Sequence, residues 1–428
     1  MNTHEAYTPL TDHTIPETHL SRGLDFYKLT MGNVAYEKHP EAQVTFTLKN
    51  RRAEQPLTEF VTPKALAERL ESLRQRGFQP EEIAYFAGLE AQTGEARFTP
   101  DYLDHLASLT LPTIDIATDP ITNELQVQST GDWADVSLWE TVVMSEINEE
   151  YFEQLMQRNN LKLDDLYAEG NRRLDAKIAR LKARPDIKLS DFGTRRRFSA
   201  EWHEHVISRL ALECPDNFVG TSNPWFAYKY DLTPIGTFAH EMPMVYAGLE
   251  DAAGGNPLDG HATMLRDWQD HYQGDLSIAL TDTFGSEFFF ADFTPEQAQK
   301  WRGVRHDSGD PFAFGERVID FYQQLEIDPA TKTIIFSDGL DIDMIEKLAD
   351  HFSGQIQLMF GWGTSLTNDL GLPSNNIVMK ATHVNGVDTV KLSDDTGKHT
   401  GPEQLVQRYQ SAVADRIGTQ ATKELVLR

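Results

Sequence analysis

Residues 333–352 read TIIFSDGLDIDMIEKLADHF, and this stretch carries the pattern that decides the fold. Its first four residues are apolar or β-branched, as in a short buried strand, and a polar turn with glycine follows them. A helix is expected after this turn, because apolar residues recur at helical spacing, at Ile342, Ile345, Leu348, Ala349 and Phe352. Gly354 lies where it can end this helix. The stretch therefore predicts one strand, one loop and one crossover helix.

The same order of apolar run, polar loop and helix repeats through the second half of the chain. The apolar runs cover residues 187–191, 218–221, 235–238, 276–280, 303–305, 333–336, 356–360 and 377–380. About eight such units within roughly 200 residues are typical of a (β/α) barrel. An open doubly wound sheet has the same local pattern and stays open as an alternative.

The first half of the chain has a mixed pattern. Residues 43–49 and 113–127 are typical of strands, residues 62–73 of a helix, and residues 163–181 of an amphipathic helix that Pro185 ends. We therefore predict an α/β protein with an N-terminal α+β domain and an irregular barrel-like domain. The predicted parts are a flexible tail over 1–20, the α+β domain over 21–185, the barrel-like domain over 186–395 and a helical segment packed on the body over 396–428.

The composition excludes several classes of protein. The chain has 428 residues and a net charge of −27. Because a nucleic-acid partner requires a dense basic face, this surplus of acid predicts no nucleic-acid binding, and it disfavours anionic membranes. No apolar run approaches the ~20 residues that span a bilayer, and the N-terminus does not look like a secretion signal. The single cysteine, Cys214, excludes an internal disulfide and suggests the cytoplasm.

Polar motifs follow the predicted strands. They read DFGTRRR at 191–197, GTSN at 220–223, GTFAHE at 236–241, RHDSGDP at 305–311, FSDGLD at 336–341 and FGWGTSL at 360–366. Because the strand ends of a barrel meet at one face, we expect these motifs to form one site. Arg195, Arg196, Arg197 and Arg305 would be an island of positive charge there, which indicates a phosphate or carboxylate substrate.

Two late turns are typical of a phosphate site. The Ser337-Asp338-Gly339 turn and the Gly361-Trp362-Gly363-Thr364 turn can present backbone N–H groups, and glycine lets a phosphate approach them. The carboxylates of Asp307 and Asp310 could hold ribose hydroxyls or Mg²⁺, which prefers oxygen ligands. The direct metal ligands stay open.

Each of these residues also has a structural explanation when it is taken alone. A Gly-x-Gly pair is often a tight turn, an aspartate often caps a helix, and a single histidine such as His240 is more often a core or surface residue. Their joint placement at successive strand ends favours a functional site. His261 stands where a Walker A lysine would be required, and no His-Glu-x-x-His zinc motif is present.

In these motifs the chain resembles the nicotinate phosphoribosyltransferases, a family of type II phosphoribosyltransferases. The resemblance begins at DFYKLTM, residues 25–31, continues through DFGTRR, GTSN, GTFAHE, RHDSGDP, FSDGLD and FGWGTSL in this order, and covers most of the chain. It implies an irregular α/β barrel with an N-terminal α+β domain. It also implies a homodimer in which both subunits contribute residues to each active site.

The resemblance implies an enzyme of NAD salvage. Its reaction would join nicotinate to 5-phosphoribosyl-1-pyrophosphate, with nicotinate mononucleotide and pyrophosphate as products. ATP would be a co-substrate, coupled through a phosphohistidine, and Mg²⁺ would be the cofactor.

Individual residues receive roles from the same resemblance. Tyr27 and Phe192 correspond to the aromatic pair that holds the pyridine ring, and His240 to the histidine that ATP phosphorylates. His240, Arg305 and Asp307 are the expected catalytic residues. The other expected substrate-binding residues are Arg195, Thr221, Ser222, Asn223, Ser308 and Asp310. The expected phosphate-binding residues are Ser337, Asp338, Gly339, Gly361, Gly363 and Thr364.

Other functions remain as alternatives. Relatives that use nicotinamide carry an aspartate at the position of Ser222, so a neutral Ser222 supports nicotinate. A nicotinamide or quinolinate phosphoribosyltransferase is the nearest alternative. A non-catalytic barrel that binds a sugar phosphate and a glycosidase with two carboxylates are more distant ones.

Overall fold

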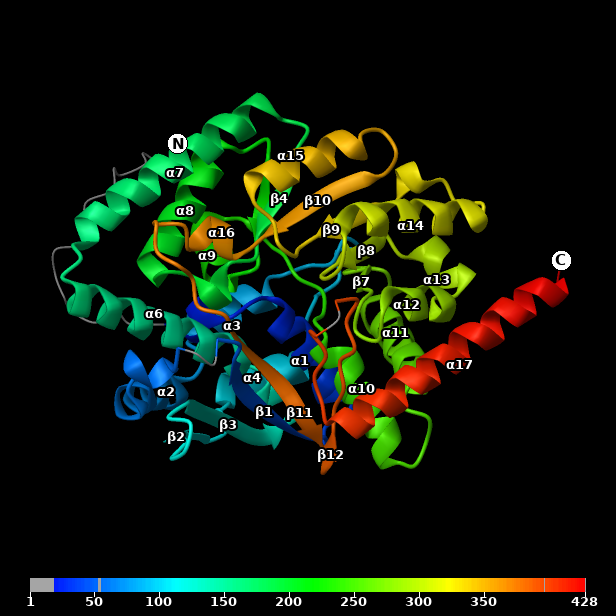
Figure 1. Cartoon of the computed structure of the whole chain (residues 1–428), viewed down its shortest axis with the longest axis horizontal. Helices are drawn as coiled ribbons and strands as arrows, with labels where there is room; N and C mark the ends of the chain where they lie inside the picture. The colour runs from blue at the N-terminus through cyan, green and yellow to red at the C-terminus, as the bar shows by residue number, and fades with distance from the viewer. Residues whose placement is uncertain (1–18, 53–54, 396, 428) are drawn as a thin grey trace.

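Two β-sheets form the frame of the molecule (Figure 1). The computed structural model describes residues 19–52, 55–395 and 397–427, with side chains up to residue 418. Residues 1–18 of the predicted flexible tail lie outside the described residues. The predicted division at residues 20, 185 and 395 stays a prediction.

The larger sheet has seven parallel strands in the order β6-β5-β4-β10-β9-β8-β7. Its two edge strands, β6 and β7, do not pair with each other in the described part of the chain, although Thr237 Oγ1 donates a hydrogen bond across this side to the carbonyl of Ile278, at 3.0 Å. The predicted barrel is therefore an open, curled half-barrel, and the α/β fold class is confirmed. The strands are β4 Leu189–Asp191, β5 Phe218–Thr221, β6 Thr233–Pro234, β7 Ile278–Leu280, β8 Gly303–His306, β9 Thr333–Phe336 and β10 Gln357–Trp362.

The smaller sheet is antiparallel and has the order β12-β11-β1-β3-β2. It joins segments that are far apart in the sequence, since Val44 of β1 pairs with Val384 of β11 (Figure 1). Its strands are β1 Gln43–Asn50, β2 Ile114–Thr118, β3 Leu125–Asp132, β11 Ile377–Val384 and β12 Val387–Asp388.

Two of the predicted barrel strands are wrong. Residues 377–380 belong to β11, in which buried and half-buried residues alternate, as expected for an antiparallel strand with one covered face. Residues 235–238 form no strand, because the chain leaves the sheet after Pro234 and packs on the first long helix. A Cβ on Gly236 would lie 2.9 Å from the backbone nitrogen of Tyr27, so this close approach requires glycine.

Helices cover both sheets. The N-terminal ones are α1 Tyr27–Lys38, α2 Pro63–Arg76, α3 Pro80–Ala87, α4 Pro100–Ser108, α5 Trp133–Val136, α6 Trp139–Asn159 and α7 Leu163–Ala183. The later ones are α8 Ala200–Glu213, α9 Pro224–Tyr230, α10 Glu241–Ala252, α11 Asp259–Tyr272, α12 Ser286–Asp292, α13 Pro295–Lys300, α14 Pro311–Gln324, α15 Ile342–His351, α16 Thr364–Thr367 and α17 Glu403–Leu427. Short 3-10 helices are η1 Leu20–Gly23, η2 Leu57–Glu59, η3 Thr194–Arg196 and η4 Pro329–Thr331.

One hydrophobic core joins the two sheets. It contains Phe46 and Met379 from the antiparallel sheet together with Leu189 and Phe360 from the parallel sheet. The first part of α17 packs in a smaller cluster around Tyr409, and the rest of this helix extends away from the body (Figure 1). Among the described residues, no helix has the length and the apolar run needed to cross a membrane.

Candidate active site

The candidate site is a pocket of about 520 Å³, within the usual size range of small-molecule sites. One wall comes from the carboxyl ends of the parallel strands, and the opposite wall comes from residues 377–381 of β11. Twelve of the predicted site residues line it: Tyr27, Phe192, Arg195, Ser222, His240, Arg305, Asp307, Ser337, Asp338, Gly339, Gly363 and Thr364. The expected meeting of distant motifs at one face is thus observed.

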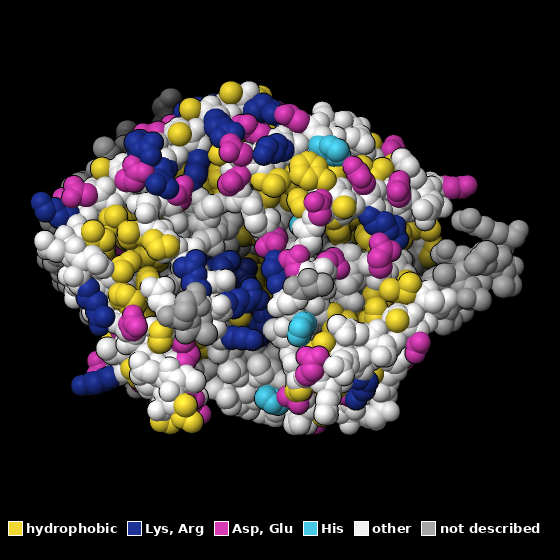
Figure 2. Space-filling model, in the orientation of Figure 1, with side chains coloured by type: hydrophobic (Ala, Val, Ile, Leu, Met, Phe, Trp, Pro, Cys, Tyr) yellow, Lys and Arg dark blue, Asp and Glu magenta, His cyan; other side chains and the backbone are white. Residues whose placement is uncertain are grey.

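Cations gather in this pocket. Figure 2 shows Lys and Arg side chains in the hollow at the centre of the molecule. Among the described residues, neither the guanidinium of Arg196 nor the ammonium of Lys380 has a hydrogen-bonding or ion-pair partner, and the Nε atom of Arg305 is buried without one. Burial and the nearby Arg195 lower the pKa of Arg196 to about 10, and burial and Lys391 lower the pKa of Lys380 to about 7. Because a half-buried cation without a hydrogen-bonding partner is stabilised by a bound anion, these groups are suited to an anionic ligand.

His240 lies at the start of α10, at one end of the pocket. Its Nδ1 is 3.0 Å from Thr283 Oγ1, and its Nε2 is 2.9 Å from Asp307 Oδ2 and 2.8 Å from Lys391 Nζ. Burial and the Lys391 ammonium lower the pKa of the imidazole. The ring is therefore neutral at pH 7 and has one nitrogen lone pair, which makes it a possible nucleophile.

Asp307 is a stable anion beside this histidine. Burial raises the pKa of its carboxyl, but the hydrogen bond with His240 and the charge of Arg305 outweigh this effect and hold the pKa well below its usual range. Ser337 Oγ donates to Asp307 Oδ1 at 2.8 Å. Ligand atoms of His240, Asp282 and Asp307 lie within 4.8 Å of one another, as in a metal site, but the Lys391 ammonium already occupies the vicinity of the imidazole. The positive charge of Lys391 therefore disfavours a metal ion at the imidazole nitrogen of His240.

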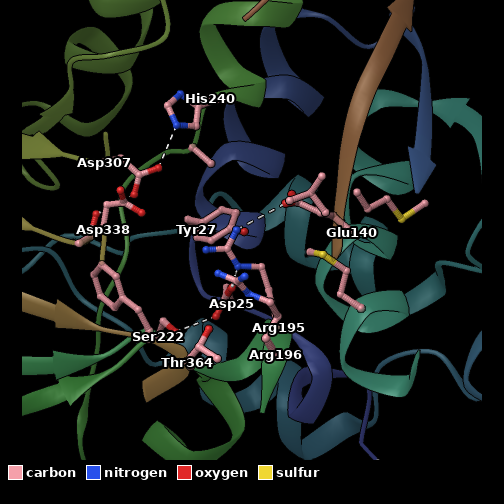
Figure 3. A pocket seen from close by; sticks show the side chains of 18 of the residues that line it. Asp25, Tyr27, Glu140, Arg195, Arg196, Ser222, His240, Asp307, Asp338 and Thr364 are labelled. Carbon is pink, nitrogen blue, oxygen red and sulfur yellow. Dashed lines mark hydrogen bonds and ion pairs between the residues drawn. The ribbon is translucent and has the colours of Figure 1, made fainter. Parts of the chain in front are cut away.

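The other end of the pocket is aromatic and carries a second charged group. Figure 3 shows Tyr27 between the His240–Asp307 pair and the Asp25–Ser222 pair. Asp25 is buried, its Oδ1 accepts a hydrogen bond from Ser222 Oγ at 2.7 Å, and its Oδ2 lies 3.3 Å from Arg195 Nε. The Arg195 guanidinium in turn lies over the Tyr27 ring, 5.9 Å from its centroid.

Five predicted site residues lie outside the pocket lining. Thr221 and Asn223 are buried behind it, where Thr221 Oγ1 donates to Asp191 and Asn223 caps α9. Ser308 is buried and donates to Asp282 at 2.5 Å. Asp310 is exposed and caps α14, which is the structural role that an aspartate before a proline often has. Gly361 makes room for a pocket residue, since a Cβ there would overlap the Phe192 ring.

The phosphate-type turns keep their predicted place. Gly339 lines the pocket with a φ of 62°, a left-handed conformation that strains other residues, and Gly363 directly precedes α16. Asp338 beside them forms an ion pair with Lys398, at 3.1 Å. These turns line the same pocket as the cations.

Glu241, the neighbour of His240, does not orient the imidazole. It is buried and binds the Lys28 ammonium, which Glu140 also contacts at 2.5 Å, and it accepts a hydrogen bond from Trp133 Nε1 at 2.6 Å. Lys28 itself is completely buried. This cluster ties α1, α6 and α10 together at the wall of the pocket, which Glu140 and Glu241 line.

Several residues of the site were not predicted. Asp25 lies within the DFYKLTM motif and could have been noticed there, since it is an acidic residue directly before Phe26 and Tyr27. Lys380 and Lys391 gave no sequence signal, because single lysines at the end of an apolar run or in a loop are common. Only the pairing of β11 with β1 places Lys380 at the pocket.

Comparisons with known proteins agree with this architecture. Residues 187–424 match the model of the nicotinate phosphoribosyltransferase (NAPRTase) family, and residues 24–148 match the model of the N-terminal domain of that family. Among curated proteins, a nicotinate phosphoribosyltransferase of Acidovorax sp. (strain JS42) is 39% identical over 397 residues, which are 90% of this chain and 95% of the relative. One of Xylella fastidiosa is 38% identical over 87% of this chain and 92% of its own.

Solved structures show the same fold. A nicotinate phosphoribosyltransferase from Porphyromonas gingivalis superposes with a TM-score of 0.83 at 27% identity, covering 93% of this chain and all of the other. One from Vibrio cholerae has a TM-score of 0.80 at 29% identity and covers 95% of this chain and 98% of its own.

Proposed function

This chain belongs to the nicotinate phosphoribosyltransferase family, and we propose that it joins nicotinate to 5-phosphoribosyl-1-pyrophosphate, giving nicotinate mononucleotide and pyrophosphate in NAD salvage. The observation that carries the proposal is one pocket of substrate size, lined by the aromatic residues Tyr27 and Phe192 and by Arg196 and Lys380, two cations without a carboxylate partner among the described residues. The aromatic rings suit a pyridine, and the cations suit the phosphates of the second substrate.

In the proposed reaction the residues mainly hold the two substrates in place. The pyridine nitrogen of nicotinate already has a free lone pair, so its attack on the ribose C1 requires no general base. Arg305, Arg196 and Lys380 balance the charge of the departing pyrophosphate, and Gly339 and Thr364 lie where the 5′-phosphate can bind backbone groups. Mg²⁺, when bound, would neutralise further charge on the leaving group. The carboxylates of Asp307 and Asp338 fit this hard ion as oxygen ligands.

His240 is the proposed site of ATP coupling. A neutral imidazole can attack the γ-phosphorus of ATP, with ADP as the leaving group. The ammonium of Lys391, whose Nζ lies 2.8 Å from His240 Nε2, would offset the charge of the phosphoryl group. Hydrolysis of the phosphohistidine would then favour product formation.

The proposal includes two properties of the whole protein. A homodimer with shared active sites follows from the family resemblance, and sedimentation analysis tests it. The reducing cytoplasm is the proposed location, and the free and buried Cys214 is compatible with it.

The test is incubation of the full chain with phosphoribosyl pyrophosphate, Mg²⁺ and each of nicotinate, nicotinamide and quinolinate, with and without ATP. We expect mononucleotide from nicotinate, with faster formation when ATP is present. The absence of nicotinate mononucleotide under both conditions would overturn the proposed function.

We expect His240→Asn to lose the stimulation by ATP and to retain slow transfer without ATP. The measurement is mononucleotide formation with and without ATP. His383→Asn is the matched control, because His383 is half exposed on β11, contacts Asp388 and Thr382, and lies outside the pocket lining. ATP stimulation that survives in His240→Asn would contradict the phosphohistidine role.

A further inference from the structure

A buried carboxylate lies at the floor of the aromatic end of the pocket. The backbone of Ser222 forms hydrogen bonds with Asp191, which precedes Phe192, and with Phe26, which precedes Tyr27. Its N–H donates to the carbonyl of Asp191 at 2.8 Å, and its carbonyl accepts from the N–H of Phe26 at 2.5 Å. Phe192, Tyr27 and Ser222 line the same pocket, so a planar ring held by the two aromatic residues would lie near Ser222, and Asp25 accepts the hydrogen bond of the Ser222 hydroxyl at 2.7 Å.

The number of protons on the Ser222 hydroxyl and the Asp25 carboxyl limits which ligand groups can form hydrogen bonds there. A hydroxyl has one proton, and an ionised carboxylate only accepts hydrogen bonds. While Asp25 is ionised, Ser222 must donate to Asp25 and offers only lone pairs to the pocket. A nicotinate carboxylate would then meet an acceptor, whereas a protonated Asp25 would donate to Ser222 Oγ and free the hydroxyl proton for the ligand.

The charges around Asp25 oppose one another, so a bound ligand can shift the equilibrium between its ionised and protonated forms. Arg195 from η3 favours its ionised form, and Asp191 from β4 opposes it. Glu140 from α6 also forms an ion pair with Arg195, with Glu140 Oε1 3.8 Å from Arg195 Nη1. Lys28, from the same segment as Asp25, is already held by Glu140 and Glu241. Burial raises the pKa of Asp25 above its usual value, and a second carboxylate in the slot would raise it further.

We propose that Asp25 takes up a proton from solvent when nicotinate binds, so that the Ser222 hydroxyl turns from Asp25 to the nicotinate carboxylate. Asp25 is then a positioning residue that sets the choice between an acid and an amide through Ser222. This inference rests on the proposed use of nicotinate. It predicts that nicotinate binds with net proton uptake, while nicotinamide binds without it, because an amide N–H can donate to the lone pairs of Ser222.

The test is calorimetric titration of nicotinate into the full chain in pairs of buffers with different ionisation enthalpies, from about pH 6 to about pH 8. For the wild type we expect uptake of up to one proton per nicotinate, and a Kd that rises by up to about tenfold per pH unit above the pKa of Asp25 in the free protein. Asp25→Asn keeps an amide donor toward Ser222, so it should bind nicotinate without proton uptake and with a Kd that does not change with pH.

Two controls make the outcome specific. His240→Asn removes another titratable group of the pocket and should retain the proton uptake, and nicotinamide should bind the wild type without it. The absence of proton uptake in the wild type overturns the inference, even if Asp25→Asn does not fold. Proton uptake that persists in Asp25→Asn overturns it too, and so does proton uptake that disappears in His240→Asn. If the wild type forms nicotinate mononucleotide without proton uptake, only this inference fails. If it forms none, the proposed function fails with it.

Discussion

Arg305 shows how one residue links charge to the chemistry of the pocket. It lies on β8 at the carboxyl end of the sheet, where Nη1 donates to the carbonyl of Phe238 at 3.4 Å and Nε has no partner among the described residues. Its charge helps to keep the pKa of Asp307 low. An anionic substrate would complete the hydrogen bonds of this guanidinium.

We expect Arg305→Ala to lower kcat/KM by roughly 30-fold or more, because a bound anion then loses a charged partner at a cost of about 2 kcal/mol or more. Steady-state kinetics with phosphoribosyl pyrophosphate varied measures the loss. The matched control is Arg302→Ala, since Arg302 is exposed and lies outside the pocket lining. Full activity of Arg305→Ala would show that this cation does not face the substrate.

Gly361 permits the position of Phe192. A methyl group at residue 361 would overlap the Phe192 ring, so Gly361→Ala must displace a wall of the aromatic slot. We expect the KM for nicotinate to rise by about tenfold while the overall fold is retained, measured by kinetics and circular dichroism. Gly88→Ala is the control, because a Cβ there has only ordinary contacts of 3.5 Å or more. An unchanged KM would contradict the role of Phe192 in binding nicotinate.

At the scale of elements, a loop segment supports the end of the pocket where His240 lies. Residues 391–394 lie across the carboxyl ends of β7 and β8. There, the N–H of Leu392 donates to the carbonyl of Thr283 at 2.8 Å, and Asp394 accepts from both the N–H and the Oγ of Ser286. Ser308 Oγ accepts from the N–H of Asp394 at 3.2 Å. The segment thereby brings Lys391 to His240, and the sequence motif that contains Ser308 serves this anchoring.

We expect Asp394→Ala to release this segment, since hydrogen bonds to a charged carboxylate contribute about 1.5–3 kcal/mol. Without Lys391 nearby, the pKa of His240 should rise, so the acid limb of the pH profile for ATP-stimulated turnover should move to higher pH, with about tenfold lower activity near neutrality. Asp388→Ala, which removes a surface contact with His383, is the control. An unshifted profile would mean that the Asp394 contacts do not position Lys391.

At the scale of the whole molecule, the cationic pocket lies in a strongly acidic protein. The net charge of −27 causes repulsion within the folded chain, while exposed ion pairs contribute little stability. The pocket attracts anions locally, because Arg196, Arg305 and Lys380 lie together in it and form no ion pair within the described part of the chain.

We expect added salt to stabilise the fold, since screening weakens the repulsion among surface carboxylates. The midpoint of urea unfolding should rise when KCl is increased from about 0.02 M to about 0.3 M. Sucrose at equal osmolality is the control, because it stabilises by exclusion from the surface without screening charge. A midpoint that falls with KCl would show that ion pairs outweigh the repulsion.

Local features of the chain were predictable from the sequence, whereas the direction of individual side chains was not. The strand and helix of residues 333–352 were predictable, because their signals are local periodicities. The gathering of Arg195, His240 and Arg305 was predictable too, because parallel strands bring their carboxyl ends to one edge. The roles of Thr221, Ser308 and Asp310 were not, because residue type does not determine which way a side chain points.

The sequence by itself determined the alternation of strands and helices and the residue types at the strand ends. Only the tertiary structure decided that β11 joins β1 in a second sheet, that the barrel stays open, that Lys380 lines the pocket and that Lys391 contacts His240. The physical reason is that periodicity and turn chemistry act between near neighbours. The pairing of Val44 with Val384 and the burial of Asp25 depend on contacts between segments that are distant in the chain.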